Sequence, residues 1–203
     1  MTSRRERLIV EGMRLFGEKG YAATSVAEIE EAAGLSPGSG SLYKHFHSKQ
    51  ELLEAGLDRI LESRNGIPGV DGMPAEPAER LHAAARAGLK RLDQDRDVSR
   101  LLFRDLDAFP ELLRRFGNEE IRRAQRRTTA MLADLAGDAR EAADWSAVAA
   151  VLQGATTHYW LMRDLFGRHP TGVSEKRFVA ALVAMTMALL DGAAAAEEDH
   201  GRG

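Results

Sequence analysis

Polar side chains that suit contact with nucleic acid are concentrated between Leu42 and Phe46. These two apolar residues are four apart, so on a helix they share one face and would attach it to a core. Of the three residues between them, Tyr43, Lys44 and His45, at least two must then point outward. An exposed hydroxyl, ammonium and imidazole suit a phosphate-lined groove, where phosphate contacts position a protein and contacts to base edges specify the sequence. A face that is merely solvated is the alternative interpretation.

Catalytic and metal chemistry find little support in the sequence. The chain has no cysteine, which excludes disulfides, thiol catalysis and cysteine-ligated zinc. Its histidines include no His-x-x-x-His pair. Two Glu-x-x-His spacings occur, but Glu79 lies just after a Gly- and Pro-rich linker and Glu197 lies in the tail, whereas a di-iron bundle needs such motifs on long core helices. The small-residue run 36–41 fits neither a dinucleotide fingerprint nor a Walker loop, and nothing marks a nucleophile elbow there, since no strand precedes the run. We therefore predict no catalytic residue, no metal and no cofactor, and expect that the chain is not an enzyme.

Three helical segments would position the polar residues. Residues 3–19 have the apolar spacing of an amphipathic helix. Ser25 and Glu28 have the spacing of a capping box, which begins a short helix ending at about residue 33. The pair Ser36-Pro37 is expected to begin a third helix, because proline is favoured in a first turn. Three such helices would form a helix-turn-helix head.

The remainder of the chain is predicted to be helical as well. Ser48-x-x-Glu51 is a second capping box that begins a helix running to about residue 64, and the Gly- and Pro-rich residues 65–78 form a linker loop. Five further helices are expected, at about 77–95, 98–107, 110–136, 140–167 and 174–192, and the tail 194–203 is expected to be disordered. The predicted fold class is all-α, with about nine helices. Its predicted domains are a helix-turn-helix domain, residues 1–50, and a helical domain, residues 51–193.

Four runs of residues agree in order and spacing with a known family. They are Phe16-Gly-Glu-Lys-Gly-Tyr21, Thr24-Ser-Val-x-x-Ile29, Ala33-Gly-Leu-Ser36 and Gly40-Ser-Leu-Tyr-Lys-His-Phe-x-Ser-Lys49. Together they resemble the DNA-binding head of the TetR repressor family, over about residues 5–55. The segment 36–41 is two residues longer than the shortest form of that loop in the family.

The resemblance implies a set of DNA contacts. Lys49 resembles the family's phosphate-contacting lysine, and Thr24 or Ser25, at a helix N-terminus, could offer a hydroxyl and backbone N–H groups to a phosphate. The residues expected to contact DNA are Thr24, Ser25, Ser36, Ser39, Ser41, Tyr43, Lys44, His45 and Lys49.

The resemblance also implies that the helical domain binds an effector and dimerises. Residues 178–190 are apolar nearly all round, and residues 145–157 are rich in Ala and Gly, which permits close helix approach. We therefore predict a homodimer through the helices at about 140–167 and 174–192, packed as a four-helix bundle across a two-fold axis. A buried core within one chain is the alternative.

Large apolar residues with a few polar neighbours in the middle helices suggest a small-molecule pocket, since such pockets are mostly apolar with a few convergent polar groups. Ordinary packing is the alternative for each of them. The residues expected to line the pocket are Phe103, Phe109, Met131, Gln153, Thr156, His158, Trp160 and Met162.

The charge distribution limits how DNA could be bound. Residues 1–50 carry seven Lys and Arg against six Glu, a net charge of +1, whereas the remaining residues carry a net −4. Binding would therefore depend on a few placed cations. The N-terminal segment lacks the apolar core of a signal peptide and no run of about 18 apolar residues occurs, so we expect a cytoplasmic protein with no membrane span.

These observations predict a DNA-binding transcriptional regulator. The expected partners are a double-stranded DNA operator, a small-molecule effector and a second copy of the chain. We expect a repressor that is released from a palindromic operator by its effector. The alternatives are an all-α ligand-binding protein or enzyme whose N-terminal helices are structural, and a non-specific architectural DNA binder.

Overall fold

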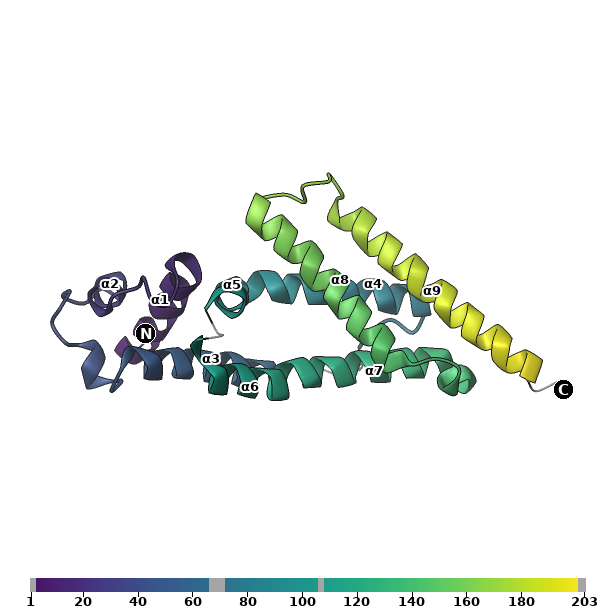
Figure 1. The fold of residues 1–203 in the computed structure, drawn as a ribbon, viewed down its shortest axis with the longest axis horizontal. Helices are drawn as coiled ribbons and strands as arrows, with labels where there is room; N and C mark the ends of the chain where they lie inside the picture. Colours follow the sequence, from purple (N-terminus) through teal and green to yellow (C-terminus); the bar gives the residue numbers. More distant parts are fainter. Residues whose placement is uncertain (1–2, 66–71, 106–107, 201–203) are drawn as a thin grey trace. The chain divides into compact units, whose positions relative to one another are not determined.

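The computed structural model describes residues 3–65, 72–105 and 108–200, and within these ranges the chain forms helices and no strand (Figure 1). The all-α class predicted from the sequence is confirmed. The chain divides into two compact units. Unit 1 comprises Met1–Ile67 and Asp95–Glu120, and unit 2 comprises Pro68–Gln94 and Ile121–Gly203.

Unit 1 is built around the first helix of the chain. Its elements are α1 (Arg4–Lys19), α2 (Val26–Ala32), a 3₁₀ turn η1 (Leu42–Lys44), α3 (Lys49–Asn65), α5 (Arg96–Arg104) and α6 (Pro110–Phe116). Helix α1 packs against α2, α3 and α5, and Phe16, Ile29 and Leu101 are among the buried residues of their common core. Helix α5, which follows residue 50 in the chain, packs on the same helix as α2 and α3. The predicted domain boundary at residue 50 therefore does not coincide with the boundary of unit 1.

Local signals in the sequence fix the ends of the first two helices. The Ser3 hydroxyl accepts the Glu6 N–H at 3.1 Å at the start of α1. Gly20 follows α1 with φ +99° and donates its N–H to the Phe16 carbonyl at 3.0 Å, a backbone conformation that glycine adopts most readily. The capping box predicted at Ser25 is present with both of its hydrogen bonds.

The end of α1 is held from α5 by a charged pair. Arg104 donates its guanidinium N–H groups to the carbonyls of Phe16 at 2.7 Å and Gly17 at 3.2 Å. Asp105 accepts the Tyr21 N–H at 3.0 Å. Cations are favourable at helix C-termini, where carbonyls lack intrahelical partners. The loop that leads from α1 to α2 is therefore fixed at its start.

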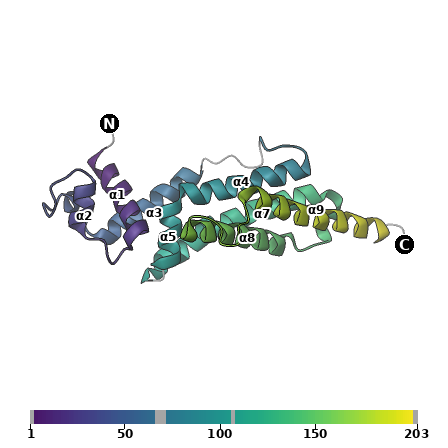
Figure 2. The ribbon, with the colours of Figure 1, turned by 90° about the horizontal axis from the view of Figure 1, so that it is seen from above.

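Unit 2 contains the longest helices. Its elements are α4 (Pro77–Gln94), α7 (Arg122–Ala136), a 3₁₀ turn η4 (Gly137–Glu141), α8 (Trp145–Phe166) and α9 (Glu175–His200). Helix α8 packs against α4 and α7, and α9 packs against α4 (Figures 1 and 2). A polar link joins these helices: Trp160 donates its Nε1–H to Asp93 at 3.0 Å, and Arg163 donates to both oxygens of Asp93 at 2.6 and 2.7 Å and to Glu175 at 2.8 Å.

The expected helix 110–136 has the predicted ends, since α6 begins at Pro110 and α7 ends at Ala136, and it contains a π-helical turn, Gly117–Ile121. Two other predicted elements differ from the structure. The expected helix 140–167 begins only at Trp145, after η4. The tail predicted to be disordered is helical as far as His200, because the four alanines at 193–196 strongly favour helix. Part of the predicted linker 65–78, residues 66–71, lies outside the described residues.

Candidate nucleic-acid interface

The segment expected to carry a DNA-reading helix is a loop followed by a 3₁₀ turn. Gly38 and Gly40 have φ of +71° and +70°, and regular helical structure begins only at Leu42 and ends at Lys44. The prediction that Ser36-Pro37 begins a helix is therefore wrong. Two glycines in the left-handed region cannot lie in a continuous right-handed helix, and this outweighs the preference of proline for a first turn.

The 3₁₀ turn presents three polar side chains to solvent. Leu42 and Phe46 are buried in the core of unit 1, as predicted. Tyr43 is 57% exposed, and Lys44 and His45 are exposed beside it. The turn is closed by hydrogen bonds from the Tyr43 N–H to Gly40 at 3.1 Å and from the His45 N–H to Leu42 at 2.9 Å. The outward orientation matches the expectation, and contact with DNA stays a prediction.

Hydroxyl groups line the loop that precedes this turn. Ser36 and Ser39 are exposed and Ser41 is half-buried. The hydroxyl oxygens of Ser39 and Ser41 lie 2.7 Å apart, in hydrogen-bond contact. These groups lie in one short stretch of chain with Tyr43 and can donate to phosphate oxygens.

The exposed N-cap of α2 is an ionic cluster. Glu28 accepts the Ser25 N–H and hydroxyl, each at 2.8 Å, and the Lys19 ammonium at 2.7 Å. The hydrogen bond from Lys19, with those from Ser25, lowers the pKa of Glu28 to about 2. Ser25 is therefore exposed, as a DNA contact requires, but its hydroxyl is engaged in capping α2.

Thr24 lies inside the head. Its side chain is buried, and its hydroxyl donates to the carbonyls of Gly20 at 2.7 Å and Leu15 at 3.2 Å. The prediction that this hydroxyl is offered to a phosphate is wrong for this structure. Thr24 instead joins the end of α1 to the start of α2 through these two hydrogen bonds.

Lys49 is likewise directed inward. Its ammonium donates to the carbonyls of Tyr21 and Thr24, both at 2.8 Å, and lies 4.2 Å from the centroid of the Tyr21 ring. Burial lowers the pKa of this ammonium. The structure thus places the charge over the α1–α2 loop, and the predicted phosphate contact would require Lys49 to leave these acceptors.

The head of the chain matches a known family of regulators. Residues 8–55 match the family model described as "Bacterial regulatory proteins, tetR family". This part of the chain, from α1 to the start of α3, is therefore similar to the N-terminal region of TetR-type regulators. The relatives that share this region include transcriptional regulators, the class of protein that the sequence predicted.

Similarity to individual TetR-type proteins is concentrated in one part of the chain. The transcriptional activator FasR of Mycolicibacterium smegmatis is 33% identical over 49% of this chain and 45% of its own length. The transcriptional repressor KstR2 of Mycobacterium tuberculosis is 37% identical over 46% of each chain. The chain therefore spans less than half the length of these two relatives. One is an activator and the other a repressor, so they do not fix the direction of regulation here.

A solved structure extends the likeness of fold to nearly the whole chain. A TetR-family regulator from Rhodococcus sp. covers 94% of this chain and all of its own, with a TM-score of 0.60 and 18% identity. At this identity the comparison concerns the fold alone. It agrees with a helix-turn-helix head joined to a helical domain.

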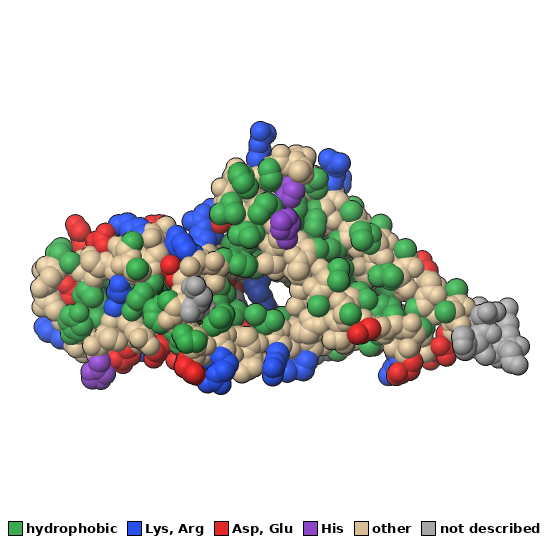
Figure 3. All heavy atoms as spheres, viewed as in Figure 1, with side chains coloured by type: hydrophobic (Ala, Val, Ile, Leu, Met, Phe, Trp, Pro, Cys, Tyr) green, Lys and Arg blue, Asp and Glu red, His purple; other side chains and the backbone are tan. Residues whose placement is uncertain are grey.

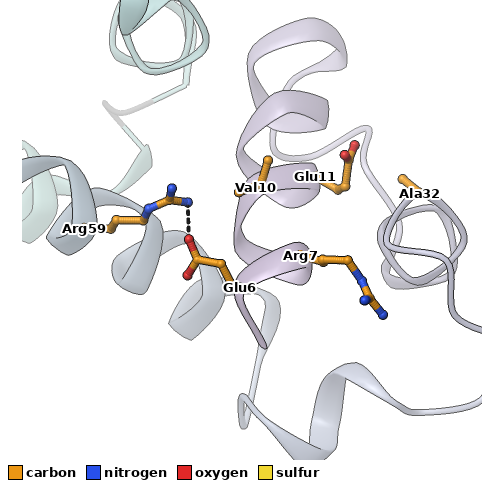
Figure 4. Close-up of a pocket in the computed structure, with 6 residues that line it drawn as sticks. All are labelled: Glu6, Arg7, Val10, Glu11, Ala32 and Arg59. Carbon is orange, nitrogen blue, oxygen red and sulfur yellow. Dashed lines mark ion pairs between the residues drawn. The ribbon is translucent and has the colours of Figure 1, made fainter. Parts of the chain in front are cut away.

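Two open clefts lie on unit 1. The larger, about 440 Å³, lies between α1, α2 and α3, and an ion pair between Arg59 and Glu6 at 2.8 Å crosses its rim (Figure 4). The smaller, about 240 Å³, lies beside the start of α6 and is bordered by Phe109, one of the residues expected to line an effector pocket. Neither cleft gathers the other predicted pocket residues.

The predicted pocket residues are divided between the two units. Phe103 and Phe109 belong to unit 1, where Phe103 is 55% exposed and Phe109 packs edge-on against Tyr21. The other six belong to unit 2, and the structure engages most of them in packing or in local hydrogen bonds. Met131 and Trp160 are buried in the core. Gln153 donates to the Thr128 hydroxyl at 3.1 Å, and Thr156 donates to the Leu152 carbonyl. Met162 is half-buried and His158 is exposed. The packing alternative therefore describes Met131 and Trp160.

The helices predicted to form the dimer interface leave apolar surface exposed. The exposed residues of α8 include the apolar Ala147, Ala150, Val151, Leu165 and Phe166, and those of α9 include Ala181, Ala184, Met185, Ala188 and Leu189. Val151 and Met185 are 67% and 69% exposed. Hydrophobic side chains are visible along both helices in Figure 3. By length and composition alone, the stretch Glu175–Glu197 is also long and apolar enough to cross a membrane, a property that the sequence did not lead us to expect.

Sequence reasoning missed Arg104, Asp105 and Glu30 as residues that hold the head in place. Nothing in the sequence marks Arg104 and Asp105, because their partners lie more than 80 residues away along the chain. Glu30 carried a signal: it lies four residues after Val26 and three before Ala33, a spacing that places it on the same face of α2 as these two apolar residues. A charge on that face is unusual and indicates a specific partner.

Proposed function

We propose that this chain is a transcriptional repressor that binds an operator through Tyr43, Lys44 and His45. The observation that carries the proposal is the exposed 3₁₀ turn, closed by buried Leu42 and Phe46, on a head that matches the TetR family. A phenol, an ammonium and an imidazole on adjacent residues can contact both phosphates and base edges. The serine hydroxyls of residues 36, 39 and 41 would add contacts to the backbone of the duplex.

The proposed operator is palindromic because the proposed binding form is a homodimer. The apolar stripes of α8 and α9 would pack against their copies in a second chain, which buries side chains such as Val151 and Met185. Two heads would then enter successive major grooves, about 34–36 Å apart. Cytoplasmic localisation follows from this role.

The test of DNA binding begins with selection from a randomised duplex library. The wild type should enrich a palindromic sequence, and fluorescence anisotropy should then show a higher affinity for that sequence than for a scrambled duplex. Lys44→Ala should weaken binding about tenfold and reduce the slope of log affinity against log salt by about one for each phosphate that the variant no longer neutralises. Lys90→Ala removes an equal charge from the exposed face of α4 and should leave both quantities unchanged.

Two outcomes would contradict the proposed recognition. Failure to enrich any sequence, with equal affinity for all duplexes, would favour a non-specific architectural role. Failure to bind any duplex would favour an all-α ligand-binding protein. Tyr43→Ala tests one predicted contact directly. It should reduce the affinity for the selected sequence while leaving the fold and the dimer intact.

The dimer is tested independently by sedimentation. Val151→Arg places a charge in the proposed interface and should give monomers, whereas Leu113→Arg changes an exposed residue on α6 in unit 1 and should leave dimers. A dimer that survives the Val151 substitution and a similar change at Met185 would place the interface elsewhere.

Release by an effector is the regulatory part of the proposal. A ligand can shift the chain away from DNA only if it binds the DNA-free form more tightly. A panel of small molecules should therefore contain compounds that raise the Tm of the free protein and also weaken operator binding. Compounds that raise the Tm and strengthen operator binding would indicate corepression.

A further inference from the structure

A buried carboxylate joins α2 to the turn that carries Tyr43. Glu30 is 0% exposed, and its Oε1 accepts the Leu42 N–H at 2.9 Å. The backbone carbonyl of Glu30 also accepts the Leu35 N–H at 2.8 Å. One residue of α2 therefore holds the chain just before and just after the glycine-containing loop 36–41.

The turn needs this support because the loop before it is not helical. Hydrogen bonds within the turn begin with the Tyr43 N–H, which is bonded to Gly40. The Leu42 N–H comes one residue earlier and belongs to a residue that is 0% exposed. A buried backbone donor without an acceptor is costly, so the Glu30 carboxylate serves as the cap of the turn.

Stability alone does not account for a glutamate at this position. The second oxygen, Oε2, is buried and has no hydrogen-bond partner among the described residues. A buried carboxylate held by so few contacts is expensive, and an apolar residue of similar size would often be tolerated as well or better. What Glu30 does provide is a fixed distance between α2 and the start of the turn.

We propose that Glu30 is a positioning residue for DNA recognition, although it contacts no DNA. The loop 36–41 contains two glycines in the left-handed region, beside which an added Cβ would meet nothing within 4 Å. Packing therefore does not hold the loop at these two glycines. The places of Tyr43, Lys44 and His45 depend on Leu42, and the place of Leu42 depends on Glu30. This inference rests on the proposed function.

The experiment compares Glu30→Met and Glu30→Gln with a matched control. Glu31→Met makes the same change at the next position of α2, which is exposed. The quantity measured is selectivity, the ratio of affinities for the selected duplex and for a scrambled one. Glu30→Met should lower selectivity about tenfold, because the Leu42 N–H then has no acceptor. Glu30→Gln keeps an amide oxygen as acceptor and should retain selectivity within about threefold, as should Glu31→Met.

A purely structural role gives a different result. In that case Glu30→Met would weaken both affinities together. A positioning role weakens only the affinity for the selected duplex and leaves the non-specific affinity close to that of the wild type, even though the unpaired Leu42 N–H lowers the Tm. Wild-type selectivity in a folded Glu30→Met protein would overturn the inference. So would a Glu30→Met protein in which stability and both affinities fall in parallel.

Amide hydrogen exchange on the wild type supplies a second measurement, which stands even if Glu30→Met does not fold. The Leu42 amide should exchange far more slowly than that of Ser41, its half-buried neighbour in the loop. Equal exchange at the two positions would overturn the inference. If the wild type selects no DNA sequence, the proposed function fails, and the exchange rates still show whether Glu30 holds the turn.

Discussion

The contact between α1 and α5 allows a sharp test of how the head is held. Gly17 lies in the last turns of α1 and is buried. A Cβ at this position would lie 2.6 Å from the Cα and 2.9 Å from the carbonyl oxygen of Asp97, on α5. Backbone atoms cannot rotate away as the end of a side chain can, so Gly17→Ala requires α5 to move or α1 to distort.

Two effects of opposite sign determine the magnitude. Replacing glycine by alanine inside a helix ordinarily stabilises it by about 0.5–1 kcal/mol. Overpacking a close contact typically costs about 1–3 kcal/mol, and an approach of 2.6 Å to backbone puts Gly17 at the upper end of that range. The net expectation is a loss of about 2 kcal/mol in the free energy of unfolding, or about 4–8 °C in Tm for a chain of this size.

The assay is thermal unfolding followed by circular dichroism, with Gly88→Ala as the control. Gly88 lies inside α4, and an added Cβ would meet only a Thr156 methyl at 3.6 Å, an ordinary contact. Gly88→Ala should therefore raise the Tm while Gly17→Ala lowers it. If both substitutions raise the Tm equally, the close approach of α1 and α5 does not exist in solution and the reasoning is refuted.

Three further predictions concern polar contacts. Thr24→Val keeps the shape of the side chain but removes its two hydrogen bonds, so it should lower the free energy of unfolding by about 1–3 kcal/mol; an unchanged urea midpoint would contradict this. Glu28 has a pKa lowered to about 2, so the stabilisation from its bond with Lys19 is complete at pH values above the ordinary pKa of a carboxylate and is lost as the pH falls towards 2. The Tm difference between wild type and Glu28→Gln should therefore shrink over that pH range. A difference that stays constant would show that the charge of Glu28 does not stabilise the fold. Asp93→Asn removes the charge that Arg163 contacts with two hydrogen bonds and should lower the Tm more in low salt than in high salt; equal losses would show that the pair contributes through packing alone.

Features that depend on neighbouring residues could be predicted from the sequence. The capping box at Ser25 forms because both partners lie within one turn of the same helix. Leu42 and Phe46 are both buried, as their spacing of four predicts, and the Phe46 N–H donates to the Leu42 carbonyl at 3.0 Å, as it would in an α-helix. The second capping box formed only in part: Ser48 accepts the Glu51 N–H at 3.0 Å, but the Glu51 carboxylate bonds to the N–H of His47 instead of Ser48.

Features that depend on distant partners could not be predicted. Lys49 has the residue type and position of a phosphate contact, but its acceptors are carbonyls 25 and 28 residues away. The hydroxyl of Thr24 is likewise suited to a phosphate and is buried against the end of α1. A single sequence gives the chemistry that a side chain can perform, and the tertiary fold decides which partner it meets.

In residues 36–46, the local sequence and the contacts with distant residues together determine the structure. Two glycines in six residues, Gly38 and Gly40, already disfavour a helix there, and their positive φ angles replace it with a loop. A helix would have placed its outward residues by its own repeating hydrogen bonds. A loop and a single 3₁₀ turn lack those repeating hydrogen bonds. The orientation of Tyr43 is therefore set by the buried residues beneath it, Leu42 and Glu30. Sequence specificity in this head is therefore expected to depend on buried positions as well as on the side chains that meet the DNA.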